Sequence, residues 1–193
     1  MANNDAPFGL SSSTRTGSSY VGGLNLYSIP ASDSTIMAVG DPVISAGGAD
    51  ADGIATIARA TAGTAVRGYI AGFVFDNRDQ ENLPSFRPAS VEAHALVVDD
   101  PSSRILIQED SDGGALTAAS VGLNVNFIVA NANSVTGKSQ VEIDSSTANT
   151  TATLPLKLLG LYQIEGNEFG ANAIWVCSFN THELKALTGS TGV

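Results

Sequence analysis

The side chains that most often act as catalytic bases and nucleophiles are scarce in this chain of 193 residues. His94 and His182 are the only histidines, and Cys177 is the only cysteine. Nucleophilic catalysis places a serine or cysteine beside a base, which is usually histidine. His94 falls within an alternating run, 91–98, which is typical of a half-exposed strand residue, and Cys177 lies in an apolar run that favours a buried thiol. Because the sequence also has no Gly-x-Ser-x-Gly elbow and no glycine-rich phosphate loop, we expect no catalytic residues and no enzyme.

Two acidic turns are the candidates for a metal site. Residues 50–53 (Asp-Ala-Asp-Gly) and 109–113 (Glu-Asp-Ser-Asp-Gly) both combine carboxylates with a glycine turn, as calcium loops do. Neither completes the twelve-residue calcium pattern, and Asp-Gly is a common turn former in its own right. The sequence therefore favours solvated turns, and we expect no metal and no other cofactor.

Paired carboxylates can also hydrolyse sugars, so a hydrolase on a β scaffold is a competing hypothesis. Glycan sites usually carry several aromatic side chains, whereas aromatic residues make up 6% of this chain and Trp175 is the only tryptophan. Nothing in these residues favours an enzyme.

Charge and composition exclude several classes of partner. Nine basic against nineteen acidic residues leave a net charge of −10, so nucleic acids and anionic membranes are not expected as partners. No run approaches the 18 apolar residues of a membrane span. The start of the chain lacks the basic and apolar regions of a secretory signal, so we expect synthesis in a reducing cytoplasm.

The elements that must position any site are short strands. Apolar runs with alternation are separated by Gly, Pro, Asp and Asn turns, which predicts an all-β fold, either a jelly-roll-like sandwich or a barrel. No repeat of fixed period emerges, so a solenoid or propeller is not expected. Short helical turns are expected at 115–121 and 182–187, and glycines 68 and 72 predict a bulge or close backbone approach within the longest run, 66–75. The predicted core comprises Tyr69, Ile70, Phe73, Val97, Ile105, Ile107, Phe127, Val129, Leu156, Leu158, Leu161, Trp175 and Phe179.

The first twenty residues differ from the rest of the chain. A short apolar patch, 6–10, is followed by a stretch, 11–19, that is almost entirely Ser, Thr and Gly. Such a segment has too little apolar surface to fold alone. We predict an extended N-terminal arm (1–20), one β domain (21–187) and a flexible tail (188–193).

Seven segments along the chain form a recognisable set. They are the opening 1–10 (MANNDAPFGL), the corner 40–43 (GDPV), the pair 67–68 (RG), and the segments 108–116 (QEDSDGGAL), 144–147 (DSST), 150–154 (TTATL) and 167–173 (NEFGANA). In consistent order from residue 1 to about 185, they resemble the head decoration (cement) proteins of tailed bacteriophages.

The resemblance implies a jelly-roll-like β fold without catalysis and a role on the capsid exterior of a virion. There the protein would bind the major capsid protein at capsomer junctions and stabilise the head. We expect Pro7, Phe8, Gly9 and Leu10 to bind this partner, with Phe8 and Leu10 as anchors.

A homo-oligomer is also expected, a dimer or alternatively a trimer, because shell junctions lie on symmetry axes. The alternative function is a carbohydrate- or receptor-binding β module of the virion, with calcium-assisted binding as one form of it.

Overall fold

The short alternating runs form thirteen β-strands in the part of the chain that the structure describes. The structure is a computed structural model that describes residues 3–13, 23–74, 86–133, 135–185, 189 and 191–192. The strands are β1 (Ser11–Ser12), β2 (Asn25–Ile29), β3 (Met37–Ala38), β4 (Pro42–Ala49), β5 (Ala55–Arg59), β6 (Gly68–Val74), β7 (Phe86–Arg87), β8 (Ala93–Val98), β9 (Arg104–Gln108), β10 (Asn124–Ile128), β11 (Glu142–Asn149), β12 (Leu156–Leu161) and β13 (Ile174–Phe179). One 3₁₀ turn, η2 (Ala118–Ser120), is the only helical element among these residues.

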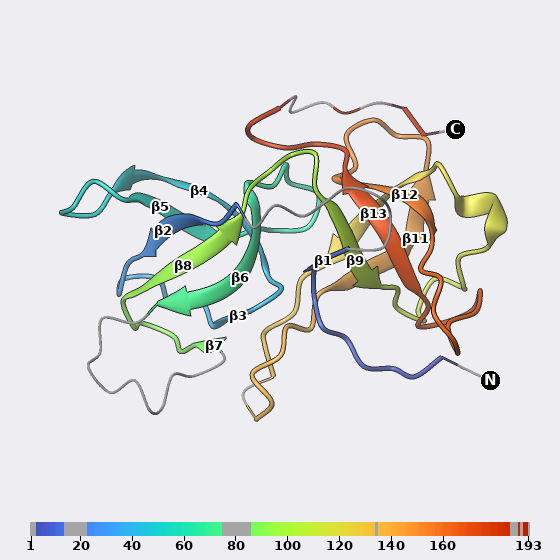
Figure 1. The fold of residues 1–193 in the computed structure, drawn as a ribbon, viewed down its shortest axis with the longest axis horizontal. Coiled ribbons are helices and arrows are strands. Elements are labelled where there is room, and N and C mark those ends of the chain that lie inside the picture. The colour runs from blue at the N-terminus through green and yellow to red at the C-terminus, as the bar shows by residue number, and fades with distance from the viewer. Residues whose placement is uncertain are drawn as a thin grey trace.

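The fold is all-β, as predicted. Five strands close a barrel in the order β2-β5-β4-β6-β8, and a six-stranded sheet has the order β1-β9-β13-β12-β10-β11. The two lie side by side, with the barrel to the left and the six-stranded sheet to the right in Figure 1. The barrel prediction therefore describes the first sheet, whereas the jelly-roll arrangement is not confirmed. The expected helix at 115–121 is reduced to η2, and that at 182–187 begins with a turn and then leaves the described residues.

The two halves of the chain share one strand topology. We call β2, β4, β5, β6 and β8 the N-unit, and β9 to β13 the C-unit. In the N-unit, β2 pairs antiparallel with β8 and parallel with β5, and β4 pairs with β5 and β6. At the same positions in the C-unit, β9 pairs antiparallel with β13, and β10 pairs with β11 and β12. In the C-unit the parallel contact is a single bridge between Glu109 and Ile143, which nearly closes the sheet.

The residue registers of the two units also agree. Val43 pairs with Gly68 in the N-unit, as Val125 pairs with Leu156 in the C-unit. The pairing of the fourth and fifth strands shifts between Ile70 and Gly72 in the N-unit, and between Leu158 and Gly160 in the C-unit. The pairing of the second and third strands differs, because its register shifts between Ser45 and Ala49 in the N-unit but between Asn124 and Asn126 in the C-unit. The units therefore share their topology and most of their registers, which is the pattern of an internal duplication.

The glycines of β6 have the roles expected of them. Gly72 follows the bulge in the β6–β8 pairing. A Cβ atom at Gly68 would collide with the carbonyl oxygen of Val98, so the backbones of β6 and β8 approach closely there.

The core crosses from one unit to the other. The larger cluster contains Val66, Tyr69 and Val98 from the N-unit together with the inward side chains of the C-unit, and a smaller cluster fills the N-unit barrel. Ten of the thirteen predicted core residues are buried, while Phe73, Val129 and Leu161 are partly buried against these clusters. The shared core joins the two units into one body.

The C-terminal tail is attached to the body at the residues that the structure describes. The Gly189 N–H donates to the carbonyl oxygen of Ala152 (3.0 Å), and Lys157 Nζ donates to that of Thr191 (2.9 Å). The Gly192 N–H donates to the Thr150 carbonyl oxygen (3.2 Å), so residues 189, 191 and 192 of the tail expected to be flexible are hydrogen-bonded to the body.

Replacing Trp175 with alanine is expected to lower the free energy of unfolding by about 3–5 kcal/mol, because its side chain is fully buried at the centre of the larger cluster. Urea denaturation followed by circular dichroism measures the loss. A loss below about 1 kcal/mol would contradict the observed burial.

Candidate partner-binding site

The N-terminal segment 3–13 runs in extended form along the C-unit (Figure 1). Its first residue is held by the Asn3 side chain, which donates to the carbonyl oxygen of Glu168 (2.9 Å). Its middle is held by Gln108 on β9, whose Oε1 accepts from the Ala6 N–H (3.0 Å). The described part of the predicted arm, 3–13, lies on the protein's own body, and the rest of the arm, 1–2 and 14–20, lies outside the described residues.

Gly9 and Leu10 fix the segment at the contact between the two units. Gly9 has a φ of +73°, and a Cβ atom there would lie 2.5 Å from the Gly40 carbonyl oxygen and 2.6 Å from Ser139 Oγ. The Leu10 N–H donates to the same Gly40 oxygen (2.8 Å). Glycine is required at position 9 because any side chain would both strain the backbone and separate these segments.

The corner that receives Gly9 is itself rigid. Asp41 accepts a hydrogen bond from the Ala38 N–H at Oδ2 (2.9 Å) and one from Ser139 Oγ at Oδ1 (2.5 Å). Burial raises the pKa of Asp41, and these hydrogen bonds partly offset that effect. The corner residues thus join the connections before β4 and before β11.

Two of the four residues expected to bind the partner are buried within the protein itself. Leu10, one of the two expected anchors, is 1% exposed and belongs to the larger core cluster, and Gly9 is buried, so neither residue presents a surface to a partner. The apolar spacing in 6–10 signals internal packing in this chain. Pro7 and Phe8 remain partly exposed and are the predicted site residues that a partner can reach.

Phe8 borders a shallow hollow of about 210 Å³ between the N-terminal segment and the loop 162–173. The hollow is open to solvent, and its walls combine aliphatic side chains with amides, namely Asn4, Gln108, Ile164, Asn167, Asn172 and Ile174. The lining also includes the carboxylate of Glu165 and contains no basic side chain, so it suits a protein contact better than an anionic ligand.

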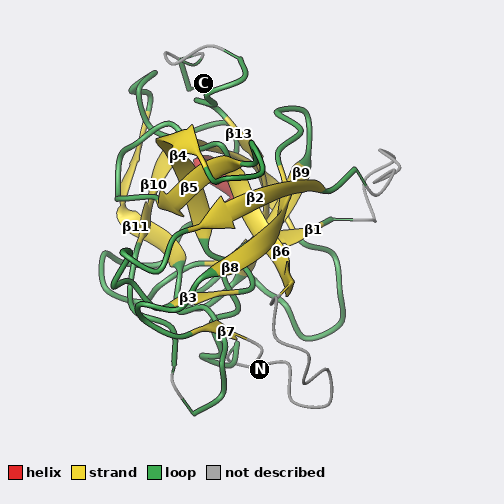
Figure 2. Cartoon of the chain, turned by 90° about the vertical axis from the view of Figure 1, so that its left-hand side faces the viewer, coloured by secondary structure: helices red, strands yellow, loops and turns green. Residues whose placement is uncertain are grey.

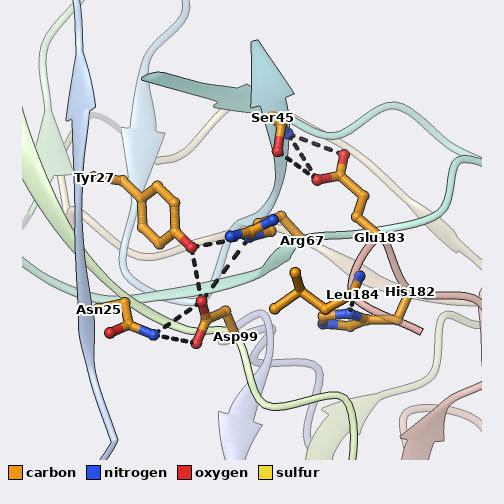
Figure 3. Close-up of polar contacts among 8 residues, drawn as sticks. All are labelled: Asn25, Tyr27, Ser45, Arg67, Asp99, His182, Glu183 and Leu184. Carbon is orange, nitrogen blue, oxygen red and sulfur yellow. Dashed lines mark hydrogen bonds and ion pairs between the residues drawn. The ribbon is translucent and has the colours of Figure 1, made fainter. Parts of the chain in front are cut away.

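A polar cluster of the N-terminal half of the chain lies beside the segment that follows β13 (Figure 3). Asp99 is its centre and accepts hydrogen bonds from Asn25 Nδ2 (2.8 Å) and Tyr27 Oη (2.7 Å). Arg67 Nε donates to the Tyr27 oxygen (2.9 Å) and lies 3.9 Å from Asp99 Oδ2. Burial, followed by the bond to Asp99, raises the pKa of Tyr27, so this phenol stays neutral.

The segment after β13 closes this joint from the C-unit. The Glu183 N–H donates to the Val66 carbonyl oxygen (2.9 Å), and the Glu183 carboxylate accepts from Ser45 N (3.0 Å) and Ser45 Oγ (2.5 Å). His182 is fully buried, and its Nδ1 accepts from the Leu184 N–H (3.1 Å). Burial, with the nearby Arg67 charge, lowers the pKa of His182, which keeps the ring neutral.

These arrangements give no catalytic set within the described residues. The described nitrogen contact of His182 is with backbone, and His94 Nε2 pairs with Asp50 Oδ2 (3.2 Å) on the barrel surface. Cys177 is fully buried, and burial raises the pKa of its thiol. The polar cluster is a structural joint.

Neither acidic turn forms a metal centre. Asp50 Oδ1 accepts from the N–H groups of Asp52 (3.0 Å) and Ile54 (2.9 Å), which is the geometry of a self-contained turn. No group of three or more His, Cys, Asp and Glu side chains across the described ranges is placed to hold a metal ion.

The second turn instead buries a carboxyl group. Glu109 is fully buried, and its Oε2 accepts from Trp175 Nε1 (3.2 Å) and the Leu116 N–H (3.1 Å). Burial raises the pKa of Glu109 to about 7. Burial also raises the pKa of the neighbouring Glu142 to about 7, with further contributions from Asp5 and other nearby carboxylates.

Two residues that make several structural hydrogen bonds are not identified from the sequence. Arg87 is fully buried and donates to three backbone carbonyl oxygens in the connection between β2 and β3, including that of Thr35 (2.7 Å), and to the carbonyl oxygen of Val91 before β8 (2.6 Å). Asn167 closes the loop 162–173 by donating to the Tyr162 carbonyl oxygen (2.8 Å). A lone Arg or Asn in a loop carries no pattern, so only the fold reveals its partners.

The comparisons with family models, curated proteins and solved structures find no match to this chain. Within the described residues, no helix has the length and apolar character needed to cross a membrane.

Leu10→Ala is expected to lower the free energy of unfolding of the isolated protein by about 2–5 kcal/mol, because it opens a cavity in the core. Urea denaturation measures the change, with Leu159→Ala as the control because Leu159 is an exposed leucine on β12. Equal and small losses in both variants would show that Leu10 does not pack in the core.

Glu109→Gln is expected to flatten the pH dependence of stability. A folded pKa raised from 4.5 to about 7 means that the native state holds this proton more tightly than the unfolded chain. Protonated Glu109 contributes no more than roughly 3 kcal/mol to the free energy of unfolding. This contribution is complete below about pH 4.5 and is lost as the pH rises towards 7. Unfolding measured from pH 5 to 8 tests this.

The control for this experiment is Glu92→Gln, which changes an exposed carboxylate. It should leave the pH profile of the natural chain unaltered. A Glu109→Gln profile with the same slope as the natural chain would contradict the prediction.

Proposed function

We propose that this chain is a structural decoration (cement) protein of tailed-bacteriophage heads. It binds the major capsid protein on the outside of the shell at capsomer junctions and stabilises the head without catalysis. The observation that carries the proposal is the ordered resemblance of seven segments spread over residues 1 to about 185.

The contacts among those segments support this proposal. The opening segment packs on the corner through the Leu10–Gly40 hydrogen bond (2.8 Å). The segments 108–116 and 144–147 meet where Asp110 Oδ1 accepts from the Ser145 N–H (3.1 Å) and Oγ (2.5 Å). The resembling residues are thus the ones that connect distant parts of the fold, so a shared pattern of these residues favours a shared architecture.

Charge and surface chemistry also favour the exterior of a shell. A net charge of −10 repels the DNA that fills a head and offers no basic face to it. The buried polar groups at the joint between the units and around Glu109 form hydrogen bonds within the protein itself. What remains for a partner is the surface, including Pro7 and Phe8 beside the hollow.

The test uses heads of the encoding phage assembled without this protein. Added protein is expected to bind their outer surface at saturable sites, to appear at capsomer junctions by electron cryomicroscopy, and to raise the temperature at which the heads open. Phe8→Ala should reduce occupancy while leaving the melting temperature of the free protein nearly unchanged, because Phe8 is only partly buried.

The matched control is Phe169→Ala, which truncates an exposed phenylalanine outside the hollow. Folded protein that does not bind heads at micromolar concentration would overturn the function. Full occupancy by the Phe8→Ala variant would overturn the role of Phe8 alone.

A further inference from the structure

The loops around the hollow beside Phe8 concentrate acidic side chains. The segments 3–10, 108–116, 142–147 and 162–173 contain no Lys, Arg or His. Their exposed or partly exposed carboxylates include Asp5, Asp112, Glu142, Asp144 and Glu165. The side chains of these segments therefore give this side of the C-unit a negative charge.

Four of these carboxylates form one continuous face with the hollow. Glu165 lines the hollow, and Asp5 lies between two of its lining residues in the chain. Asp5 and Asp112 are in turn close enough to Glu142 for their charges to act on its carboxyl group. We call this set the acidic face, namely Asp5, Asp112, Glu142 and Glu165.

The carboxylates of the acidic face repel one another. Burial, followed by the charges of Asp5, Asp110 and Asp112, raises the pKa of Glu142 to about 7. Asp110 is only 6% exposed, and its Oδ2 atom has no hydrogen-bond partner within the described part of the chain. A positive charge brought to this face would relieve the repulsion, whereas an anion would increase it.

The hollow adds apolar contact to this charge. Phe8 is partly buried and Ile164 is 36% exposed, so both present apolar surface at the hollow. A second copy of the chain is disfavoured as the occupant, because it carries the same net charge of −10. The chemistry that complements both features is a polypeptide segment with Lys or Arg next to an apolar side chain.

We propose that the acidic face and the adjoining hollow dock a basic segment of a partner protein, with a Lys or Arg side chain on the carboxylates and an apolar side chain in the hollow. This inference rests on the proposed function, which makes the partner the major capsid protein. Phe8 then supplies apolar contact, and the acidic face supplies orientation and fast association, because complementary charges steer the encounter of two proteins.

The experiment measures the binding of the full chain to heads assembled without it, at two salt concentrations. Glu165→Lys and Asp5→Lys are each expected to raise the dissociation constant by at least about tenfold at low salt, because each places a positive charge against the basic segment. The difference from the natural chain should shrink between about 0.1 M and about 1 M NaCl, since salt screens exposed charges.

The matched control is Glu92→Lys, which makes the same change of charge at an exposed residue just before β8. Figure 2 shows the barrel that contains β8 in front of the C-unit, so this control lies on the other unit from the acidic face. It should bind heads like the natural chain at both salt concentrations. Circular dichroism melting establishes that all three variants are folded, as their exposed positions predict.

The outcomes separate this inference from the proposed function. Binding of the natural chain that does not weaken with salt, or lysine variants that bind as tightly as Glu92→Lys, would overturn the inference and leave the function standing. A natural chain that does not bind heads would overturn the function and the inference together.

Two further measurements test other occupants of the acidic face. A chain without residues 1–2 should bind heads like the natural chain, and markedly tighter binding would assign the face to the chain's own terminus. Sedimentation velocity of the free chain should give the same result for Glu165→Lys as for the natural chain. Self-association that Glu165→Lys abolishes would assign the face to a second copy, and either of these results would overturn the proposal.

Discussion

The constraint on which this structure depends is that the backbone N–H and C=O groups along its longer strands need partners. A protein with few charged residues and many short side chains cannot leave long edges open without exposing a template for association. The N-unit meets the constraint by closing a five-stranded barrel, and the C-unit meets it through the bridge of Glu109 with Ile143 and the addition of β1. The N-terminal segment is therefore part of the sheet that it completes.

The same constraint explains where polar side chains are buried. Loops and short strands leave backbone carbonyl and amide groups in the interior, and these need fixed partners. Arg87 binds such carbonyls, Asp41 binds the Ala38 amide, and Glu183 binds the Ser45 amide from across the joint. The polar residues that first suggest chemistry are thus used to satisfy backbone, which is why the described histidines and carboxylates form no catalytic set.

The sequence was sufficient to predict the strands, the all-β class and most of the core, because alternation and turn residues are local signals. It could not reveal the duplication, since the connections differ in length between the units. Ile70 lies 88 residues before its counterpart Leu158, whereas Val97 lies 80 residues before Cys177, so no fixed period survives. The burial of Leu10 was equally hidden, because a leucine within a polar segment looks the same whether it enters its own core or that of a partner.

The hydrogen bond from Trp175 to Glu109 has a consequence for spectroscopy. Trp175 is the only tryptophan, and its indole N–H lies 3.2 Å from a carboxyl oxygen whose group changes charge near neutral pH. An indole beside a negative charge and an indole beside a neutral acid sit in different local electric fields. The emission of this single fluorophore therefore reports the protonation state of the C-unit interior without any added label.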